Sequence, residues 1–245
     1  MSLVTELRRI FKDTRTINDS KVISIRTLFS RVSRIFFPVH ARPKVFVVGY
    51  NKTGTTSMEA YFRQLNWRCG PQRQFEELRD EFFSGRWDRV FELIDKHDAF
   101  QDTPFSTGGG AFVAALRDRY PDAKFILTVR DSAEQWFNSL ERFHRGQWFG
   151  DKEVITWDDV ASVEYIRKGY IYASLRRVTG PDAEFPYDRE VWMQAYNAHN
   201  ESIRAELAGT ERLLEVNLRE ARASEKLADF LDLPHVLPLP HLNQS

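Results

Sequence analysis

Short apolar runs alternate along this chain with longer segments in which apolar residues recur at helical spacing. Residues 44–49, KVFVVG, form the first run, which ends in a loop that contains Gly49 and Gly54. From Thr55 onward the apolar positions follow a helical period: Met58, Tyr61, Phe62 and Leu65. The pattern predicts a buried strand, a glycine-containing loop and a helix, in that order.

The rest of the chain continues this alternation. Further strands are predicted at residues 99–102, 124–129 and 212–216. Helices are predicted near residues 75–95, 111–120, across most of 146–210 and around 221–231. One more helix begins after Arg130, where Ser132 and Gln135 fit a capping box. Since strands that alternate with helices favour a parallel sheet, the expected fold class is α/β.

Length and composition suit one large domain. Hydrophobic residues make up 42% of the 245 residues, which is enough to build a substantial core. Cys69 is the only cysteine, so an intramolecular disulfide is excluded. No apolar stretch approaches the roughly 18 residues that span a bilayer, and the first residues lack the apolar core of a secretory signal. We therefore expect a cytoplasmic protein.

Positive charge is concentrated at the beginning of the chain, although the formal net charge is zero. Residues 1–44 contain ten Lys or Arg against three acidic residues, which gives +7 and leaves −7 for the remainder. Residues 26–37 predict a basic amphipathic helix that either contacts an anionic membrane or packs on the domain or another subunit. We separate a basic extension, residues 1–43, from a domain of residues 44–245, and expect no nucleic-acid partner.

The loop between the first strand and its helix has the residues of an anion site. Its sequence is GYNKTGTTS, residues 49–57. Gly49 and Gly54 allow the backbone to curl around phosphate oxygens, and the helix N-terminus offers unpaired N–H groups and the positive end of a dipole. Lys52 adds a full positive charge, and residues 55–57 add three hydroxyl groups. The loop therefore predicts a phosphate site.

The spacing is close to the Walker pattern G-x-x-x-x-G-K-[ST], but departs from it at one position. Thr55 follows the second glycine, and the lysine lies three residues earlier, as Lys52. A Mg·ATP-dependent small-molecule kinase, in which Asp102 binds magnesium, therefore fits only in part. A non-catalytic protein that binds nucleotide or a partner is the other alternative.

The sequence KTGTTS after an apolar strand resembles the 5′-phosphosulfate loop of the sulfotransferase family. The resemblance implies a three-layer α/β/α fold with a central parallel sheet, like P-loop nucleoside triphosphate hydrolases, plus a helical segment that covers the acceptor. It also implies 3′-phosphoadenosine 5′-phosphosulfate as the donor, no metal, and a catalytic role for Lys52 at the leaving phosphate. The donor loop would comprise Asn51, Lys52, Thr53, Gly54, Thr55, Thr56 and Ser57.

A second part of the resemblance lies in KFILTVRDSAEQWFNS, residues 124–139. In the family, an Arg at the end of a strand and a Ser on the next helix hold the 3′-phosphate, which implies Arg130 and Ser139 here. Arg suits a terminal phosphate because its planar guanidinium donates two parallel hydrogen bonds. The two residues are nine positions apart, one more than the commonest family spacing, so Asn138 or Ser132 is an alternative to Ser139.

Removal of the acceptor proton requires a general base near the sulfonate, and we assign this role to Asp102. It ends the strand AFQD and begins Asp102-Thr103-Pro104, where familiar cytosolic sulfotransferases have a Thr-His-x-Pro stretch with the catalytic histidine. The Asp-x-Pro form resembles a less studied branch of the family, and the role passes to Asp102 by position. A turn or helix cap, or a Walker-B-like acidic residue, is the alternative reading of Asp102.

The expected acceptor is a small molecule, a lipid or a carbohydrate with a hydroxyl or amine group. His97 and His144 are reserve candidates for the base. Aromatic residues of the mostly helical stretch either line the acceptor pocket or belong to the core: Trp148, Phe149, Trp157, Tyr165, Tyr170 and Tyr172. Nothing in the pattern indicates an oligomeric state.

Overall fold

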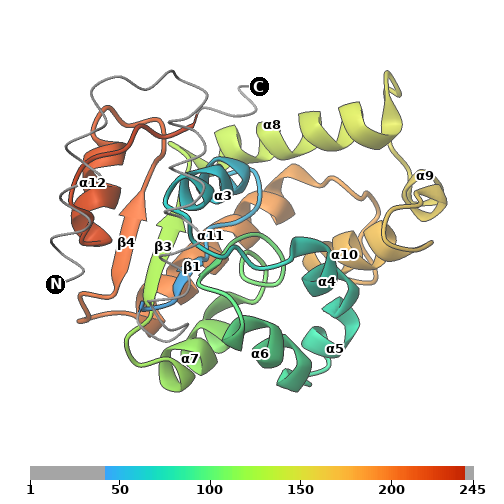
Figure 1. Ribbon diagram of the computed structural model, residues 1–245. Coiled ribbons are helices and arrows are strands. Elements are labelled where there is room, and N and C mark those ends of the chain that lie inside the picture. The colour runs from blue at the N-terminus through green and yellow to red at the C-terminus, as the bar shows by residue number, and fades with distance from the viewer. Residues whose placement is uncertain (1–41, 241–245) are drawn as a thin grey trace, which may run out of the picture. The chain divides into compact units, whose positions relative to one another are not determined.

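Four strands form one parallel sheet in the computed structural model of the protein, which describes residues 42–240 (Figure 1). They are β1 Val45–Val47, β2 Ala99–Phe100, β3 Lys124–Thr128 and β4 Leu213–Val216. Their order is β2-β1-β3-β4, and every neighbouring pair is parallel. Each strand lies within a run for which a strand is predicted, so the parallel sheet is confirmed.

Helices fill most of the chain between and after these strands. They are α3 Thr55–Gln64, α4 Gln72–Glu77, α5 Arg79–Phe83, α6 Asp88–Asp95, α7 Gly109–Arg119, α8 Ala133–His144, α9 Trp157–Ser162, α10 Tyr170–Thr179, α11 Arg189–Glu206 and α12 Ala223–Phe230. A π-helical turn, η2 Arg145–Phe149, directly follows α8. The long stretch after α8 is mostly helical, as the sequence predicts.

Two local predictions need correction. The helix predicted near residues 75–95 is three short helices, because the chain leaves helical geometry at Leu78 and turns at Gly85, where φ is 77°. The capping box at α8 is only half formed. The Ser132 hydroxyl accepts from the Gln135 N–H at 3.0 Å, but the Gln135 side chain accepts from the N–H of Asp131, one residue before the cap.

The sheet is the middle of three layers, because alternate residues of β1 point to opposite faces. Val45 and Val47 pack with Met58 of α3 and Leu227 of α12. The other face carries a larger, phenylalanine-rich cluster that joins Phe46 and Val48 to residues of α4 to α7 and α11. Figure 1 shows the sheet between these two groups of helices. The expected α/β/α arrangement is confirmed.

A third cluster, rich in aromatic residues, joins the donor loop region to the helices from α8 to α11. Trp136 of α8 stacks on Tyr196 of α11, with ring centroids 4.6 Å apart. Tyr50, the third residue after β1, contacts both rings and is itself buried. Packing of this kind fixes the loop against the helical segment that follows β3.

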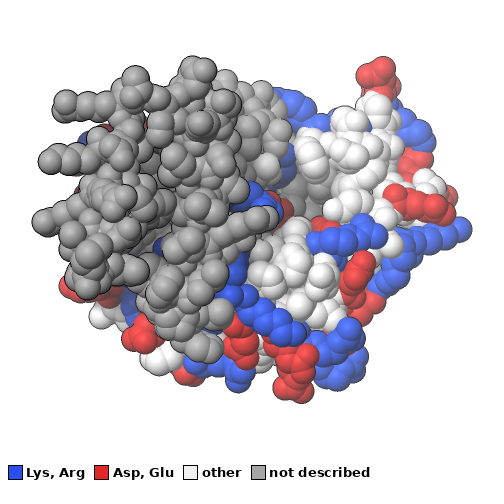
Figure 2. Space-filling model, in the orientation of Figure 1, with Lys and Arg blue, Asp and Glu red and all other residues white. Residues whose placement is uncertain are grey.

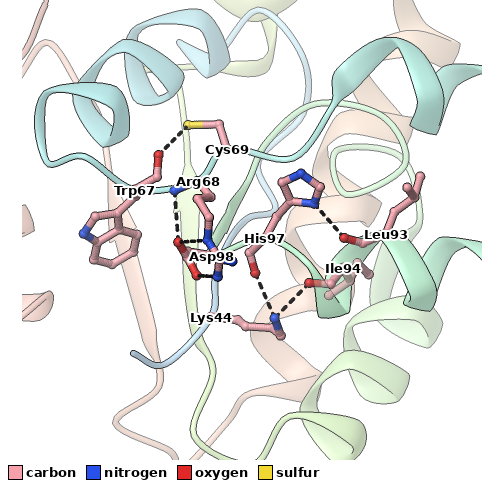
Figure 3. A network of polar contacts seen from close by, with 8 residues as sticks. All are labelled: Lys44, Trp67, Arg68, Cys69, Leu93, Ile94, His97 and Asp98. Carbon is pink, nitrogen blue, oxygen red and sulfur yellow. Dashed lines mark hydrogen bonds and ion pairs between the residues drawn. The ribbon is translucent and has the colours of Figure 1, made fainter. Parts of the chain in front are cut away.

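A polar network holds the amino-terminal ends of β1 and β2 (Figure 3). The glycine loop lies at the opposite, carboxyl end of β1. Asp98, just before β2, accepts from the Arg68 backbone and guanidinium at 2.5–3.0 Å. Burial opposes ionisation of Asp98, but these bonds outweigh it, so the pKa of Asp98 is lowered. Lys44, just before β1, donates to the carbonyls of Ile94 and His97 at 2.8 Å, which ties α6 to the sheet. His97 therefore belongs to this structural network.

Positive and negative side chains lie next to one another on the described part of the face shown in Figure 2. Such interleaving differs from the single-sign groove that tracks a nucleic-acid backbone. Within residues 42–240, no helix combines the length and the apolar character needed to cross a bilayer. The amphipathic helix expected at residues 26–37 lies outside the described residues, and so does the basic extension to which it belongs, apart from its last two residues.

Candidate active site

All the candidate site residues follow the carboxyl ends of strands, which share one edge of a parallel sheet. The loop with Lys52 follows β1, Asp102 follows β2, and Arg130 follows β3. Since β1 lies between β2 and β3, the loop lies between Asp102 and Arg130. Arg219 follows β4, beside the end of β3. The topology thus places an acidic residue on one side of the loop and two guanidinium groups on the other.

The loop is held in place by buried contacts on its inner side. The Thr53 hydroxyl donates to the Tyr50 carbonyl at 2.5 Å and lies 2.6 Å from the Thr128 hydroxyl of β3. The Trp136 indole donates to the Asn51 carbonyl at 2.9 Å. Gly49 packs so closely on β3 that a Cβ atom there would lie 2.2 Å from the Thr128 carbonyl oxygen. The loop is therefore preorganised by its neighbours before any ligand binds.

Gly49→Ala is expected to destabilise the protein by about 1–3 kcal/mol, because the new methyl group overlaps backbone that cannot move aside. Thermal unfolding followed by circular dichroism measures the effect. Gly146→Ala is the matched control, since a Cβ at Gly146 meets no atom within 4 Å and Gly146 has no positive φ. Equal melting temperatures for the two variants would contradict the packing role of Gly49.

The N-terminus of α3 is open for an anion. Its cap is Gly54, with φ 110°, and the helix has neither a side-chain cap nor an acidic residue in its first turn. Side-chain caps are present only on α8, α9 and α11 among the described α-helices, and α10 also begins after a left-handed glycine, Gly169, so a missing cap is not specific to α3. What favours an anion at α3 is the combination of its uncapped N–H groups with the Lys52 loop that leads into it.

Lys52 belongs to the loop that leads into this helix, two residues before the Gly54 cap. Lys52 has a left-handed backbone, with φ 67°, and its Nζ lies 3.7 Å from the centroid of the Phe143 ring. Among the described residues, its ammonium makes no hydrogen bond and no ion pair. Burial and the charge of Arg130 lower the pKa of Lys52, whereas the charge of Asp102 raises it. A cation held in this way is available to a ligand.

A second pocket for negative charge lies on the Arg130 side of the loop. It is a cavity of about 200 Å³ lined by Arg130, Gln135, Asn138, Ser139, Arg142 and Arg219. Arg130 Nε donates to the Lys52 carbonyl at 2.8 Å, which connects this pocket to the loop. Three guanidinium groups around so small a cavity are a strong electrostatic attraction for a phosphate.

Ser139 is the hydroxyl that this pocket leaves available. Its Oγ is buried and has no hydrogen-bond partner in the part of the chain that the structure describes. The two alternatives are engaged elsewhere: the Ser132 hydroxyl caps α8, and Asn138 Oδ1 accepts from Arg189 at 3.0 Å. A buried hydroxyl without a partner is costly unless a ligand supplies one, so the geometry favours Ser139 despite the unusual spacing.

Sequence reasoning missed two of the three arginines. Arg142 lies one helical turn after Ser139, so helical spacing alone could have placed it on the same face of α8. Arg219 follows a strand that the pattern does predict, but its place beside Arg130 depends on the pairing of β3 with β4. That pairing joins segments almost ninety residues apart and cannot be derived from local periodicity.

Asp102 faces the other side of the loop. It too has a left-handed backbone, with φ 60°, and it accepts from the Thr103 N–H at 2.8 Å and from the Thr55 hydroxyl at 3.4 Å. Burial raises the pKa of Asp102, although these bonds and the Lys52 charge oppose the rise. Only four described residues other than glycine have positive φ, and Lys52 and Asp102 are two of them. Backbone strain of this kind is concentrated at functional sites.

Comparison with known families identifies the family to which the chain belongs. A family model described as a sulfotransferase domain matches residues 44–245. The chain belongs to the sulfotransferase family. It is therefore a transferase enzyme with a P-loop-like α/β fold, as the resemblance of KTGTTS implies. A search of curated proteins found no match.

A cavity of about 530 Å³ lies next to Asp102 in this sulfotransferase. It reaches from the loop after β1, at Tyr50 and Asn51, to α10. Of the six aromatic residues singled out in the sequence, Trp148, Tyr165 and Tyr170 line it, whereas Phe149 belongs to the core and Trp157 packs on Tyr172. The size, and walls that combine several aromatic rings with a few polar groups, are typical of a small-molecule site.

His144 also lines this cavity, whereas His97 belongs to the polar network at the other end of the strands. Its Nδ1 lies 2.8 Å from the Tyr187 hydroxyl, and burial together with the Lys52 charge lowers the pKa of His144 to about 3. A neutral imidazole of such low basicity is a weak general base. Among residues 42–240, no group of three or more His, Cys, Asp or Glu side chains is arranged to hold a metal ion.

Proposed function

We propose that this sulfotransferase moves a sulfonate group from 3′-phosphoadenosine 5′-phosphosulfate to a hydroxyl or amine of an acceptor bound in the 530 Å³ cavity. The observation that carries the proposal is the pair of anion pockets at one sheet edge, connected by the bond from Arg130 to the Lys52 carbonyl. A donor with phosphate groups on both the 5′ and 3′ positions needs two such pockets. Most nucleotides need only one.

In this proposal, the loop binds the 5′-phosphosulfate and the second pocket binds the 3′-phosphate. The 5′ end would meet the residues from Asn51 to Ser57 and the uncapped N-terminus of α3. Thr55 and Ser57 are buried at that end, and Thr56 is exposed. The 3′-phosphate would accept from the Ser139 hydroxyl and from the guanidinium groups around it. The Ser139 hydroxyl would thus gain the hydrogen-bond partner that it lacks within residues 42–240.

The proposed reaction is an in-line displacement at sulfur. The acceptor oxygen or nitrogen forms a bond to sulfur as the bond from sulfur to the 5′-phosphate oxygen breaks, and its proton passes to Asp102. Lys52 stabilises the negative charge that develops on the leaving phosphate oxygen. Adenosine 3′,5′-bisphosphate is the leaving group and dissociates as the second product. Burial supports the role of Asp102, since a carboxylate with a raised pKa is a better base.

A Mg·ATP-dependent kinase is less well supported. The residue at the position of the Walker lysine is Thr55, and its hydroxyl is directed to Asp102 at 3.4 Å. The cation stands instead on the ring of Phe143, at the wall of the large cavity. A non-catalytic nucleotide-binding protein would have no need of both a lysine and a carboxylate, Lys52 and Asp102, next to such a cavity.

Adenosine 3′,5′-bisphosphate is expected to stabilise the protein without magnesium. At about 100 times its dissociation constant, it should add about 2.7 kcal/mol to the free energy of unfolding. Adenosine 5′-monophosphate at the same concentration should stabilise much less, because it leaves the Ser139 pocket empty. A melting-temperature series with the two nucleotides and with Mg·ATP measures this. Stabilisation by Mg·ATP alone would favour the kinase, and indifference to all three would refute nucleotide binding.

A further inference from the structure

The large cavity contains a carboxylate, Glu76, that forms no ion pair within the described part of the chain. Glu76 of α4 is half-buried, and both of its oxygens accept from the Tyr165 hydroxyl, at 3.1 and 3.3 Å. Its remaining bond is a long one from Gln72, at 3.4 Å. The nearest arginine on its helix, Arg73, forms its ion pair with Glu77 instead. Glu76 thus retains unused capacity to accept hydrogen bonds.

Aromatic rings surround this carboxylate at angles that suit a cation. The ring of Tyr165 lies 6.1 Å from that of Trp148 and 5.7 Å from that of Tyr170, and both pairs are inclined by 64°. All three rings line the same cavity as Glu76, but the Tyr170 ring already carries the Arg79 guanidinium at 3.6 Å, so the rings of Trp148 and Tyr165 are the ones that a ligand cation would meet. Inclined rings next to a carboxylate are the usual elements of an ammonium site, because the negative ring faces add to the carboxylate charge.

Two positive groups that line the cavity, Arg79 and Arg177, are already engaged, and a third, Lys52, stands on the Phe143 ring at its wall. Arg79 is buried, donates to the Tyr170 carbonyl at 2.6 Å and to the Ser174 hydroxyl, and pairs with Asp80 at 3.2 Å. Arg177 lies over the Phe83 ring at 3.8 Å, and the charges that act on it are those of Arg79 and Asp80. The charges that act on Glu76 are those of Asp102 and Arg73. Asp102 and Glu76 therefore place two carboxylates on the cavity, and Lys52 is the cation that acts on Asp102.

We propose that the acceptor of this sulfotransferase carries a protonated amine, which Glu76 binds while the hydroxyl to be sulfonated lies at Asp102. The acceptor class is thus a cationic hydroxy-amine, such as an amine-bearing phenol. The proposal rests on the proposed function for the role of Asp102, but amine binding at Glu76 can be measured without it. A ligand ammonium would give a half-buried carboxylate the partner that it lacks and would contact the inclined rings.

Three phenols that differ in the charge of the side chain test this proposal. Tyramine is cationic, 4-ethylphenol is neutral, and 3-(4-hydroxyphenyl)propionate is anionic at neutral pH. We expect calorimetry to show tyramine binding roughly tenfold more tightly than 4-ethylphenol and the anionic phenol binding most weakly. Titrations are made with and without saturating adenosine 3′,5′-bisphosphate. If the anionic phenol binds best, the arginine end governs recognition and the proposal is wrong.

Glu76→Gln keeps the shape of the side chain and removes its charge. It is expected to bring the affinity for tyramine to within about twofold of that for 4-ethylphenol, and to leave the neutral phenol unaffected. Glu77→Gln is the matched control, because Glu77 is exposed, adjacent and outside the cavity. The proposal fails if Glu76→Gln weakens both phenols equally, if wild type does not prefer tyramine, or if none of the three phenols binds. If tyramine is bound in this way but no sulfonate is transferred, it is the proposed function that fails.

Discussion

Replacing Lys52 by alanine is expected to lower kcat for sulfonate transfer about 10²–10³-fold, with little change in KM for the acceptor. Lys52 belongs to the loop that leads into the open end of α3, and its ammonium forms no ion pair among the described residues, so we expect its charge to act mainly on the bound donor. Charge on the leaving phosphate oxygen grows as the bond to sulfur breaks. Loss of the cation therefore affects the transition state more than the ground state. Initial rates at saturating donor, with varied acceptor, measure both constants.

Lys152→Ala is the matched control for this change. Lys152 is exposed and forms an ion pair with Asp159 on the helical segment, outside both anion pockets. Its replacement should leave kcat unchanged, because exposed ion pairs contribute little. If Lys52→Ala raised only KM for the acceptor, Lys52 would bind the acceptor and would not stabilise the leaving group.

Asp102→Asn is expected to lower kcat about 10²–10⁴-fold, the usual contribution of a general base, while the affinity for adenosine 3′,5′-bisphosphate stays near that of wild type. Asn keeps the side-chain oxygen that accepts from the Thr103 N–H but cannot take up a proton at neutral pH. Wild-type kcat/KM should fall on acidification through the raised pKa of Asp102, above the ordinary value of about 3.9. The variant should lack that acidic limb.

The same substitution separates catalysis from folding. Because burial raises the pKa of Asp102 in the folded state, its ionised form costs stability at neutral pH, and this cost disappears as pH falls below the unfolded-state pKa. Asn removes the charge and with it the cost. The melting temperature of Asp102→Asn at neutral pH should therefore equal or exceed that of wild type. Full activity in the variant would remove Asp102 from the role of base.

The strands of the sheet and the helix after the glycine loop could be predicted from local sequence pattern, because buried positions are apolar and recur with the period of the strand or helix that carries them. Local pattern was not sufficient for residues 75–95, where the breaks at Leu78 and Gly85 interrupt an apparently continuous helical pattern. Positions that leave helical geometry within an amphipathic segment depend on how the segment packs, and packing is a tertiary property.

The loop residues and Arg130 could be named from the sequence because each site motif is contiguous and follows its own strand. Arg219 could not, because it enters the site only through the pairing of β4 with β3. Glu76 was missed for a similar reason. It is an ordinary polar position on a short helix until α10 and the loop before it close the cavity around its side chain.

Strand order also divides the work of the site between separate parts of the chain. The residues proposed to hold the nucleotide come from the ends of β1, β3 and β4 and from α8, whereas the acidic part of the acceptor cavity comes from the end of β2, α4 and the segment before α10. We therefore expect substitutions in α4 and in residues 165–178 to change acceptor specificity without affecting the binding of the sulfonate donor. Diversification of such an enzyme needs no alteration of its P-loop.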